Sequence, residues 1–230
     1  MPQSIHFDKT DTLIETREII NGLSHYTLLV RDLNSLTFAE REFKCTAALC
    51  PDAALALAPL TAPSPGLDVF ALLRSDKEAS ADHKAIRSLL DSHGYRWAEG
   101  DWVAKGFSTQ TLPARYLSNL RARYPRAAPA LRRLHAAAVV NSAEIRLRKG
   151  IDLVSQGEVI ITDRLHGQLI AAMCQRPVIV LDSYDGKISA FFSAYSHRIP
   201  NIHLVQSLTD LSSVLETLLP DSPTTPVSQS

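Results

Sequence analysis

The fold of this chain is decided by residues 159–181, which read VIITDRLHGQLIAAMCQRPVIVL. Residues 159–161 form an apolar run typical of a strand that is buried on both faces. Along 164–175 the apolar residues recur at helical spacing, and Pro177 ends that helix because proline cannot donate a backbone hydrogen bond. Residues 178–181 form a second apolar run. The stretch therefore predicts a strand, a crossover helix and a second strand parallel to the first.

The same alternation of strands and helices extends outward along the chain. Further strand-like runs lie at 26–30, 46–50 and 68–73, with a strand or strand pair at 95–103. Helical spacing covers 36–43 after an Asn34-Ser35 cap, then 80–92 and 144–155, while Pro125 and Pro129 are expected to break any long helix before 144. Strands that alternate with helices predict an α/β fold with a parallel, Rossmann-like sheet.

Composition excludes several classes of protein. The chain has 230 residues, of which 45% are apolar, so it is neither disordered nor fibrous. Its 24 basic and 24 acidic residues cancel, which gives no overall field for nucleic acid. The three cysteines, Cys45, Cys50 and Cys174, are odd in number and lack C-x-x-C spacing, which argues against a disulfide framework and against a cysteine zinc site. With no signal peptide or membrane span in the sequence, we expect a protein of the reducing cytoplasm.

One segment departs from this neutral average. Residues 102–143 contain no Asp or Glu and carry seven basic residues, Lys105, Arg115, Arg121, Arg123, Arg126, Arg132 and Arg133, with Tyr116 and Tyr124 between them. A solvated face and contact with a phosphorylated or lipid-linked acceptor both fit this pattern. Nucleic-acid binding is not expected, because no recognised binding module surrounds the segment.

Basic residues follow several of the predicted strands. Arg31 and Arg74 directly follow apolar runs, Arg164 and His166 open the helix after 159–161, and Lys187 lies in the loop after 178–181. Since the carboxyl ends of parallel strands share one sheet edge, these groups can converge on one anion, and guanidinium forks suit carboxylate or phosphate. Taken singly, each residue has another interpretation: Arg31 paired with Asp32, Arg74 in a surface ion pair, Lys187 exposed in a loop and His166 in the core.

These residues also resemble a known family. Residues 162–167 (TDRLHG) and 182–188 (DSYDGKI) closely resemble the hallmark region of the polysaccharide pyruvyl transferases. Supporting matches, in the same order along the chain, are LLVRD at 28–32 with Ser35, PDA at 51–53 and LLRSDKE at 72–78, and PQSI at 2–5 also looks like a family segment. The resemblance runs from about residue 1 to about residue 219.

The resemblance implies both an architecture and a reaction. Family members have two lobes similar to those of GT-B glycosyltransferases and transfer pyruvate from phosphoenolpyruvate to a sugar as a cyclic ketal, here in surface exopolysaccharide biosynthesis with a glycan or lipid-linked acceptor. It implies that Arg31, Arg164 and Lys187 hold the donor's carboxylate and phosphate and that His166 is the acid catalyst. Arg74 and Asp52 complete the expected substrate-binding set, and Asp52 can equally be a cap or ion-pair residue. No metal or other cofactor is expected.

Members of the family carry a complete amino-terminal lobe before the matching stretch, so this chain resembles the donor-side, C-terminal lobe. We expect a hinge remnant and linking helix over 1–24, a Rossmann-like donor-binding domain over 25–219 and a disordered tail over 220–230. The oligomeric state is left open. Two other functions stay open as well: the lobe of a nucleotide-sugar glycosyltransferase, and a non-catalytic truncated paralogue that binds an anion or a partner.

Overall fold

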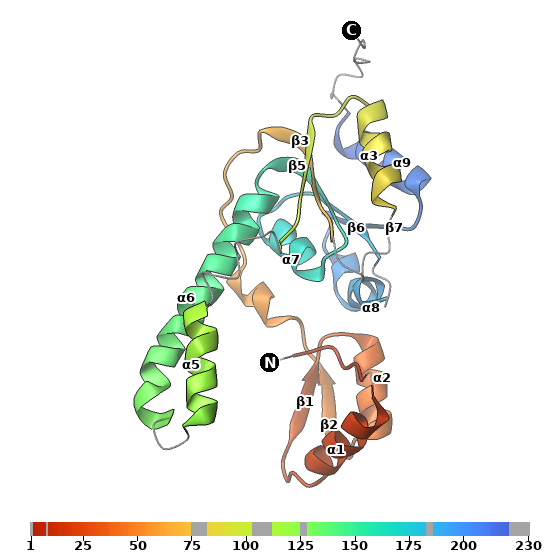
Figure 1. Ribbon diagram of the computed structural model, residues 1–230. Coiled ribbons are helices and arrows are strands. Elements are labelled where there is room, and N and C mark those ends of the chain that lie inside the picture. The colour runs from red at the N-terminus through yellow and green to blue at the C-terminus, as the bar shows by residue number, and fades with distance from the viewer. Residues whose placement is uncertain are drawn as a thin grey trace.

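The larger of the two sheets in the described part of the molecule has five parallel strands (Figure 1). The structure, a computed structural model, describes residues 2–7, 9–74, 82–102, 112–124, 128–182 and 186–220. The sheet has the order β4-β3-β5-β6-β7. Its strands are β3 (Leu67–Leu72), β4 (Trp97–Gly100), β5 (Gly157–Thr162), β6 (Val178–Leu181) and β7 (Ile202–Val205). The predicted α/β class with a Rossmann-like parallel sheet and crossover helices is therefore confirmed.

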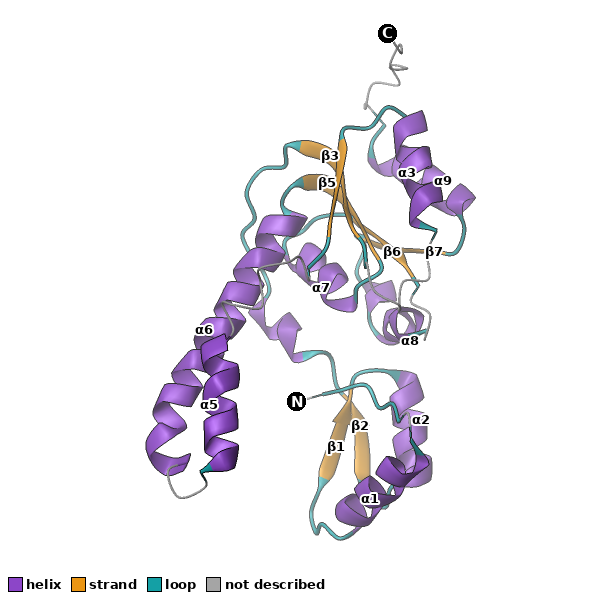
Figure 2. Cartoon of the chain, viewed as in Figure 1, coloured by secondary structure: helices purple, strands orange, loops and turns teal. Residues whose placement is uncertain are grey.

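Helices cover both faces of this sheet, as Figure 2 shows. One face packs against α3 (His83–Ser92) and α9 (Leu208–Leu218), and the other against α6 (Ala128–Val154), α7 (Leu165–Met173) and α8 (Lys187–Ala194). Along β3, Val69 and Ala71 point into the first layer and Phe70 and Leu72 into the second, because successive side chains of a strand alternate between faces. Both halves of the core are apolar, so the strand shows no alternation in its sequence.

A second, smaller sheet precedes the large one. Strands β1 (Thr27–Val30) and β2 (Thr46–Leu49) pair in parallel with each other and not with the five-stranded sheet, and α1 (Thr10–Asn21) and α2 (Leu33–Glu42) pack beside them. The short 3-10 helix η1 (Ala53–Leu57) then leads toward β3. The segment expected to form one domain, 25–219, thus contains two separate sheets, and its boundaries stay predictions.

The two helices α5 (Leu112–Arg123) and α6 form a long hairpin that extends away from the sheet (Figure 1). The expectation that Pro129 breaks a long helix here was wrong, whereas Pro125 lies outside the described residues, between the two helices. Pro129 lies in the first turn of α6, where its missing N–H has no helical acceptor to lose, so the helix continues without a break to Val154.

Other local expectations need smaller corrections. The cap of α2 is Asp32, whose Oδ1 accepts a hydrogen bond from the Ser35 N–H at 2.7 Å, and not Asn34-Ser35. The stretch 95–103, expected to hold a strand or strand pair, contains the single strand β4 in its described part, 95–102. A 3-10 turn, η3 (Ser196–Arg198), lies between α8 and β7. Almost all of the tail predicted to be disordered, 221–230, lies outside the described residues.

The three cysteines are free thiols, with Cys174 buried and the other two partly buried. A search of the described helices for a segment long and apolar enough to cross a membrane finds none.

Candidate active site

The sheet order creates a topological switch point at the carboxyl ends of β3 and β5. The chain passes from β3 to β4 on one side and then returns to place β5 on the other, so the connections leave these two strand ends in opposite directions. Such a switch point is where open α/β sheets bind ligands. The two strand ends are joined by Thr162, whose Oγ1 donates a hydrogen bond to the Leu72 carbonyl at 2.8 Å.

Close packing brings the start of α7 against this edge. A Cβ atom added to Gly167 would lie 2.8 Å from Oγ1 of Thr162 and 2.9 Å from a methyl carbon of Leu72. Only glycine lets the helix approach so closely without a shift of its neighbours. The Thr162 hydroxyl also accepts a hydrogen bond from the Arg164 N–H at 3.1 Å, so the residues before α7 are fixed by the strands behind them.

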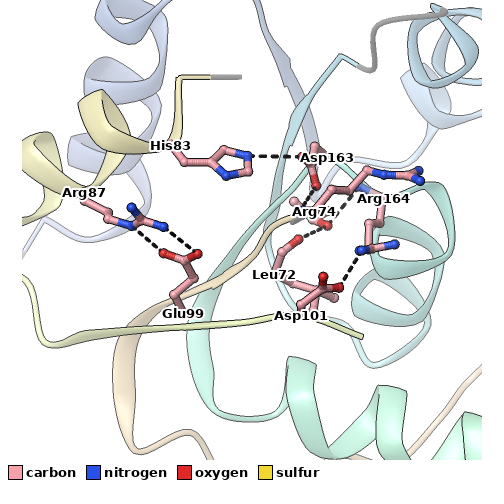
Figure 3. A network of polar contacts seen from close by, with 9 residues as sticks. Leu72, Arg74, His83, Arg87, Glu99, Asp101, Asp163 and Arg164 are labelled. Atoms are coloured by element: carbon pink, nitrogen blue, oxygen red, sulfur yellow. Dashed lines mark hydrogen bonds and ion pairs between the residues drawn. The ribbon is translucent and has the colours of Figure 1, made fainter. Parts of the chain in front are cut away.

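Asp163 is buried at the centre of this edge and fixes the chain after β3 (Figure 3). Its Oδ1 accepts a hydrogen bond from the Arg74 N–H at 2.9 Å, and its Oδ2 lies 3.4 Å from Nε2 of His83 at the start of α3. Burial raises the pKa of the Asp163 carboxyl, and the Arg74 N–H and His83 only partly offset that effect. Arg74 is therefore positioned at the switch point through its backbone.

Arg164 pairs with an acidic residue that follows β4, the strand on the far side of β3. Its Nη2 donates to Oδ1 of Asp101, which directly follows β4, at 2.5 Å (Figure 3). Only 13% of the Arg164 side chain and 16% of the Asp101 side chain are exposed. A largely buried guanidinium held by one carboxylate is fixed in orientation and keeps further N–H groups for an anionic ligand.

The second cluster joins the small sheet to the large one. Nη1 of Arg31, directly after β1, donates to Oδ2 of Asp52 at 2.6 Å, and its Nε donates to Oγ of Ser4 at 3.0 Å. The same Asp52 oxygen lies 3.9 Å from Nε2 of His166 in the first turn of α7. The cluster therefore brings together a cation, a carboxylate and an imidazole from three separate parts of the chain.

The electrostatics of this cluster favour a neutral, accessible imidazole. Desolvation lowers the pKa of His166, the Asp52 charge acts to raise that pKa, and the Arg31 charge lowers it again. The side chain is nevertheless 60% exposed, so a ligand can reach it. Burial acts to raise the pKa of Asp52, but the Ala54 N–H, the Arg31 guanidinium and His166 together outweigh burial and lower it. Asp52 is thus an anion that can orient both neighbours.

The last predicted residue, Lys187, is the first residue of α8, directly after Gly186. Gly186 has a positive φ of 64°, a conformation that glycine adopts without strain. The first turn of α8 is held by Asp182, whose Oδ1 accepts a hydrogen bond from the Ser189 N–H at 3.1 Å. The Lys187 side chain lies outside the described part of the structure, so its place in the site stays a prediction.

Of the remaining predicted site residues, Arg31, Asp52 and His166 come together in one cluster, and Arg164 and Arg74 lie at the neighbouring switch point. The alternative pairing of Arg31 with Asp32 is not observed, because Asp32 caps α2. Sequence reasoning missed Asp101 and His83 as partners. An acidic residue directly after β4 was a usable signal for Asp101, whereas nothing in the sequence marked His83.

Within the described ranges, no three His, Cys, Asp or Glu side chains gather into a group that could hold a metal ion. The described site contains guanidinium groups, the carboxylates Asp52 and Asp101 that contact them, and the exposed imidazole of His166, with the buried pair of Asp163 and His83 behind them. Guanidinium groups suit an oxyanion as ligand, and an imidazole suits proton exchange.

Comparison with known proteins identifies the family. The chain is 24% identical over 208 residues to a Bacillus subtilis protein named "Putative pyruvyl transferase EpsO", a match that covers 90% of this chain and 62% of that protein. It shares its fold, at a TM-score of 0.51 and 13% identity, with an uncharacterized protein from Klebsiella pneumoniae, again over 90% of this chain and 62% of the other. The chain thus spans less than two thirds of both relatives. A family model described as polysaccharide pyruvyl transferase matches residues 1–185. The chain therefore belongs to the polysaccharide pyruvyl transferase family.

Proposed function

We propose that this chain provides the donor-binding and acid-catalytic part of a transferase that moves pyruvate from phosphoenolpyruvate to a sugar as a cyclic ketal. The observation that carries the proposal is the cluster of Arg31, Asp52 and His166, in which one carboxylate contacts both a guanidinium and an accessible imidazole. Phosphoenolpyruvate carries a carboxylate and a phosphate ester on the same carbon atom of a small molecule. Arg31 and Arg164 supply the guanidinium groups that such a dianionic or trianionic donor requires.

The first step of the reaction is the transfer of a proton to the donor. When His166 protonates the methylene carbon of phosphoenolpyruvate, the adjacent carbon gains oxocarbenium character. One sugar hydroxyl adds to that carbon and returns a proton to His166. A second hydroxyl then displaces inorganic phosphate, which leaves with the proton of that hydroxyl, and the ketal closes. The arginines stabilise the donor and the departing phosphate, and an imidazole can both give and regain the proton.

Asp52 is expected to tune and orient His166. Its negative charge favours the imidazolium form and so acts to raise the pKa of His166, against the desolvation of the ring, which lowers that pKa. Asp101 has the matching role for Arg164, because it holds the guanidinium in place before the donor arrives. The GT-B architecture, a glycan or lipid-linked sugar acceptor, a role in exopolysaccharide biosynthesis and the cytoplasmic location belong to the same proposal.

The proposal is tested first by binding. Calorimetric titration of phosphoenolpyruvate into the wild-type chain is expected to show saturable binding. The affinity of Arg164→Ala for phosphoenolpyruvate should be lower by about tenfold or more. Saturable binding of a sugar nucleotide without binding of phosphoenolpyruvate would instead support the glycosyltransferase alternative. If neither ligand binds, the chain behaves as the non-catalytic paralogue.

Catalysis is then tested with phosphoenolpyruvate and a β-galactoside or N-acetylhexosamine acceptor. Phosphate release and ketal formation are expected to fall by about 10²- to 10⁴-fold in His166→Ala, as for loss of a general acid. Donor binding should persist in this variant, because the arginines remain. Equal rates for wild type and variant would refute the assignment of His166.

A further inference from the structure

The hairpin of α5 and α6 is not part of the candidate active site. Oγ of Ser118 on α5 lies 3.1 Å from Nε2 of His135 on α6, which ties the two helices together. The other half of α6 is anchored to the body of the molecule, since a Cβ atom added to Gly150 would lie 2.5 Å from Trp102 and 2.7 Å from Ile170. The hairpin therefore stands on a fixed base while its far end extends away from the sheet (Figures 1 and 2).

Charge is distributed unevenly between the hairpin and the rest of the chain. The span 112–143 holds six arginines and no acidic residue, although the whole chain has 24 basic and 24 acidic residues. The remainder of the chain is accordingly acidic. Of these arginines, Arg123, Arg132 and Arg133 have described side chains, and all three are exposed near the end of the hairpin that is far from the sheet.

Exposed apolar side chains lie among these arginines. Tyr124 is 52% exposed and Leu134 is 62% exposed, next in sequence to Arg123 and Arg133. We call these two residues, together with Arg123, Arg132 and Arg133, the hairpin tip. Behind the tip, three more large apolar side chains are also exposed, namely Tyr116 at 64%, Val139 at 45% and Val140 at 66%.

The spacing places apolar and basic side chains along common stripes. Val139 lies two helical turns after Arg132, and Val140 two turns after Arg133, so each pair shares one side of α6. Tyr116 and Arg123 have the same spacing on α5. Each stripe thus combines a cation near the tip with an apolar side chain behind it, so exposed charge and exposed apolar surface lie on the same side of the hairpin.

We propose that the hairpin tip docks onto the anionic lipid headgroups of a membrane surface. The arginines meet the phosphate groups, while Tyr124 and Leu134 enter the boundary between headgroups and acyl chains. A symmetric pairing of two hairpins fits this surface poorly, because the six arginines on each hairpin would repel one another. Single-stranded nucleic acid would leave the aliphatic side chains of Leu134, Val139 and Val140 without a partner.

The test is sedimentation of the full chain with large unilamellar vesicles. The wild-type chain is expected to sediment with vesicles of equal parts phosphatidylcholine and phosphatidylglycerol and not with phosphatidylcholine alone. Binding should weaken as salt rises, because the attraction to the surface is screened. The charge-reversal variant Arg123→Glu/Arg132→Glu/Arg133→Glu is expected to lose binding by about tenfold or more.

A matched control has the same change in net charge elsewhere. Lys44, Lys84 and Arg198 are exposed and lie outside the hairpin, so Lys44→Glu/Lys84→Glu/Arg198→Glu should still sediment with the anionic vesicles. A second variant, Tyr124→Ser/Leu134→Ser, keeps every charge and should bind less tightly at high salt. Far-UV circular dichroism and thermal melts that match wild type show that each variant is folded.

Three results would overturn the proposal. One is failure of the wild-type chain to bind anionic vesicles. The second is equal loss of binding in the hairpin variant and the control, which would reduce the effect to net charge. The third is a hairpin-dependent dimer, or hairpin-dependent binding of RNA, without binding to anionic vesicles.

Discussion

The carboxylate of Asp52, which follows the last strand of the small sheet, lies 3.9 Å from Nε2 of His166, which follows a central strand of the large sheet. Asp52 also receives a hydrogen bond from Arg31. One carboxylate therefore connects the two sheets at the point where their carboxyl ends meet. If His166 supplies the proton of the reaction, desolvation of the ring lowers the pH at which it can do so and the charge on Asp52 partly offsets that effect.

Removal of the Asp52 charge should shift the pH dependence of kcat/KM. In Asp52→Asn the imidazole loses a neighbouring anion, so the pKa of His166 should fall below its already lowered wild-type value. The alkaline limb of the kcat/KM profile, which reports protonation of the free enzyme's acid, should then move to lower pH. An NMR titration of the ring, assigned with His166→Ala, measures the pKa directly. Glu99→Gln, away from the cluster, serves as control, and a shift of the limb to higher pH would contradict the role of Asp52.

The ion pair of Arg164 and Asp101 should contribute a favourable coupling energy to the stability of the folded protein. Both side chains are largely buried, so Arg164→Ala leaves a carboxylate without its partner and should lower the free energy of unfolding by about 1–3 kcal/mol. The double variant Arg164→Ala/Asp101→Ala should recover much of that loss. Urea unfolding of the four proteins measures the coupling energy. Additive losses would mean that the pair contributes no coupling.

The close approach at Gly167 should be sensitive to a single methyl group. Gly167→Ala would push Cβ against Thr162 and Leu72, which we expect to lower the free energy of unfolding by about 1–3 kcal/mol. Gly66→Ala is the matched control, since nothing lies within 4 Å of the added atom. Urea unfolding should separate the two variants clearly. Equal midpoints would show that α7 does not need this approach.

Ionisation of the buried Asp163 carboxyl should lower the free energy of unfolding. Its pKa in the folded state is raised above the ordinary value of 3.8, so the folded protein binds its proton more tightly than the unfolded chain does. Asp163→Asn keeps the acceptor for the Arg74 N–H and removes the buried charge, so this variant should be more stable than wild type at neutral pH. That advantage should shrink as pH falls through the raised pKa and vanish below 3.8.

The contrasting variant is Asp163→Ala, which removes the acceptor as well. It leaves the Arg74 N–H without its hydrogen bond and should be less stable than Asp163→Asn by about 1–3 kcal/mol. Thermal melts across the pH range measure both variants. A stability advantage of Asp163→Asn that grows on acidification would contradict the sign of the shift.

Much of the large sheet could be predicted because its signals are local. The run 178–181 is β6 as predicted, and the predicted strands at 68–73 and 159–161 overlap β3 and β5. Residues just past these strands, such as Arg74 and Arg164, were placed at the carboxyl edge from strand direction alone. The helix cap at Asp32 and the continuous helix α6 were missed, because a capping side chain and a proline in the first turn depend on where the helix begins.

The sequence by itself determined the α/β class, the parallel strands and the family, because these depend on apolar periodicity and short motifs that a chain carries wherever it folds. Only the tertiary structure decided that β1 and β2 form a separate sheet, and that Asp52 and Asp101 are the partners of Arg31 and Arg164. The reason is physical: periodicity fixes the direction in which side chains point within an element. Sheet order and packing decide which elements meet, and those depend on contacts between residues far apart in the chain.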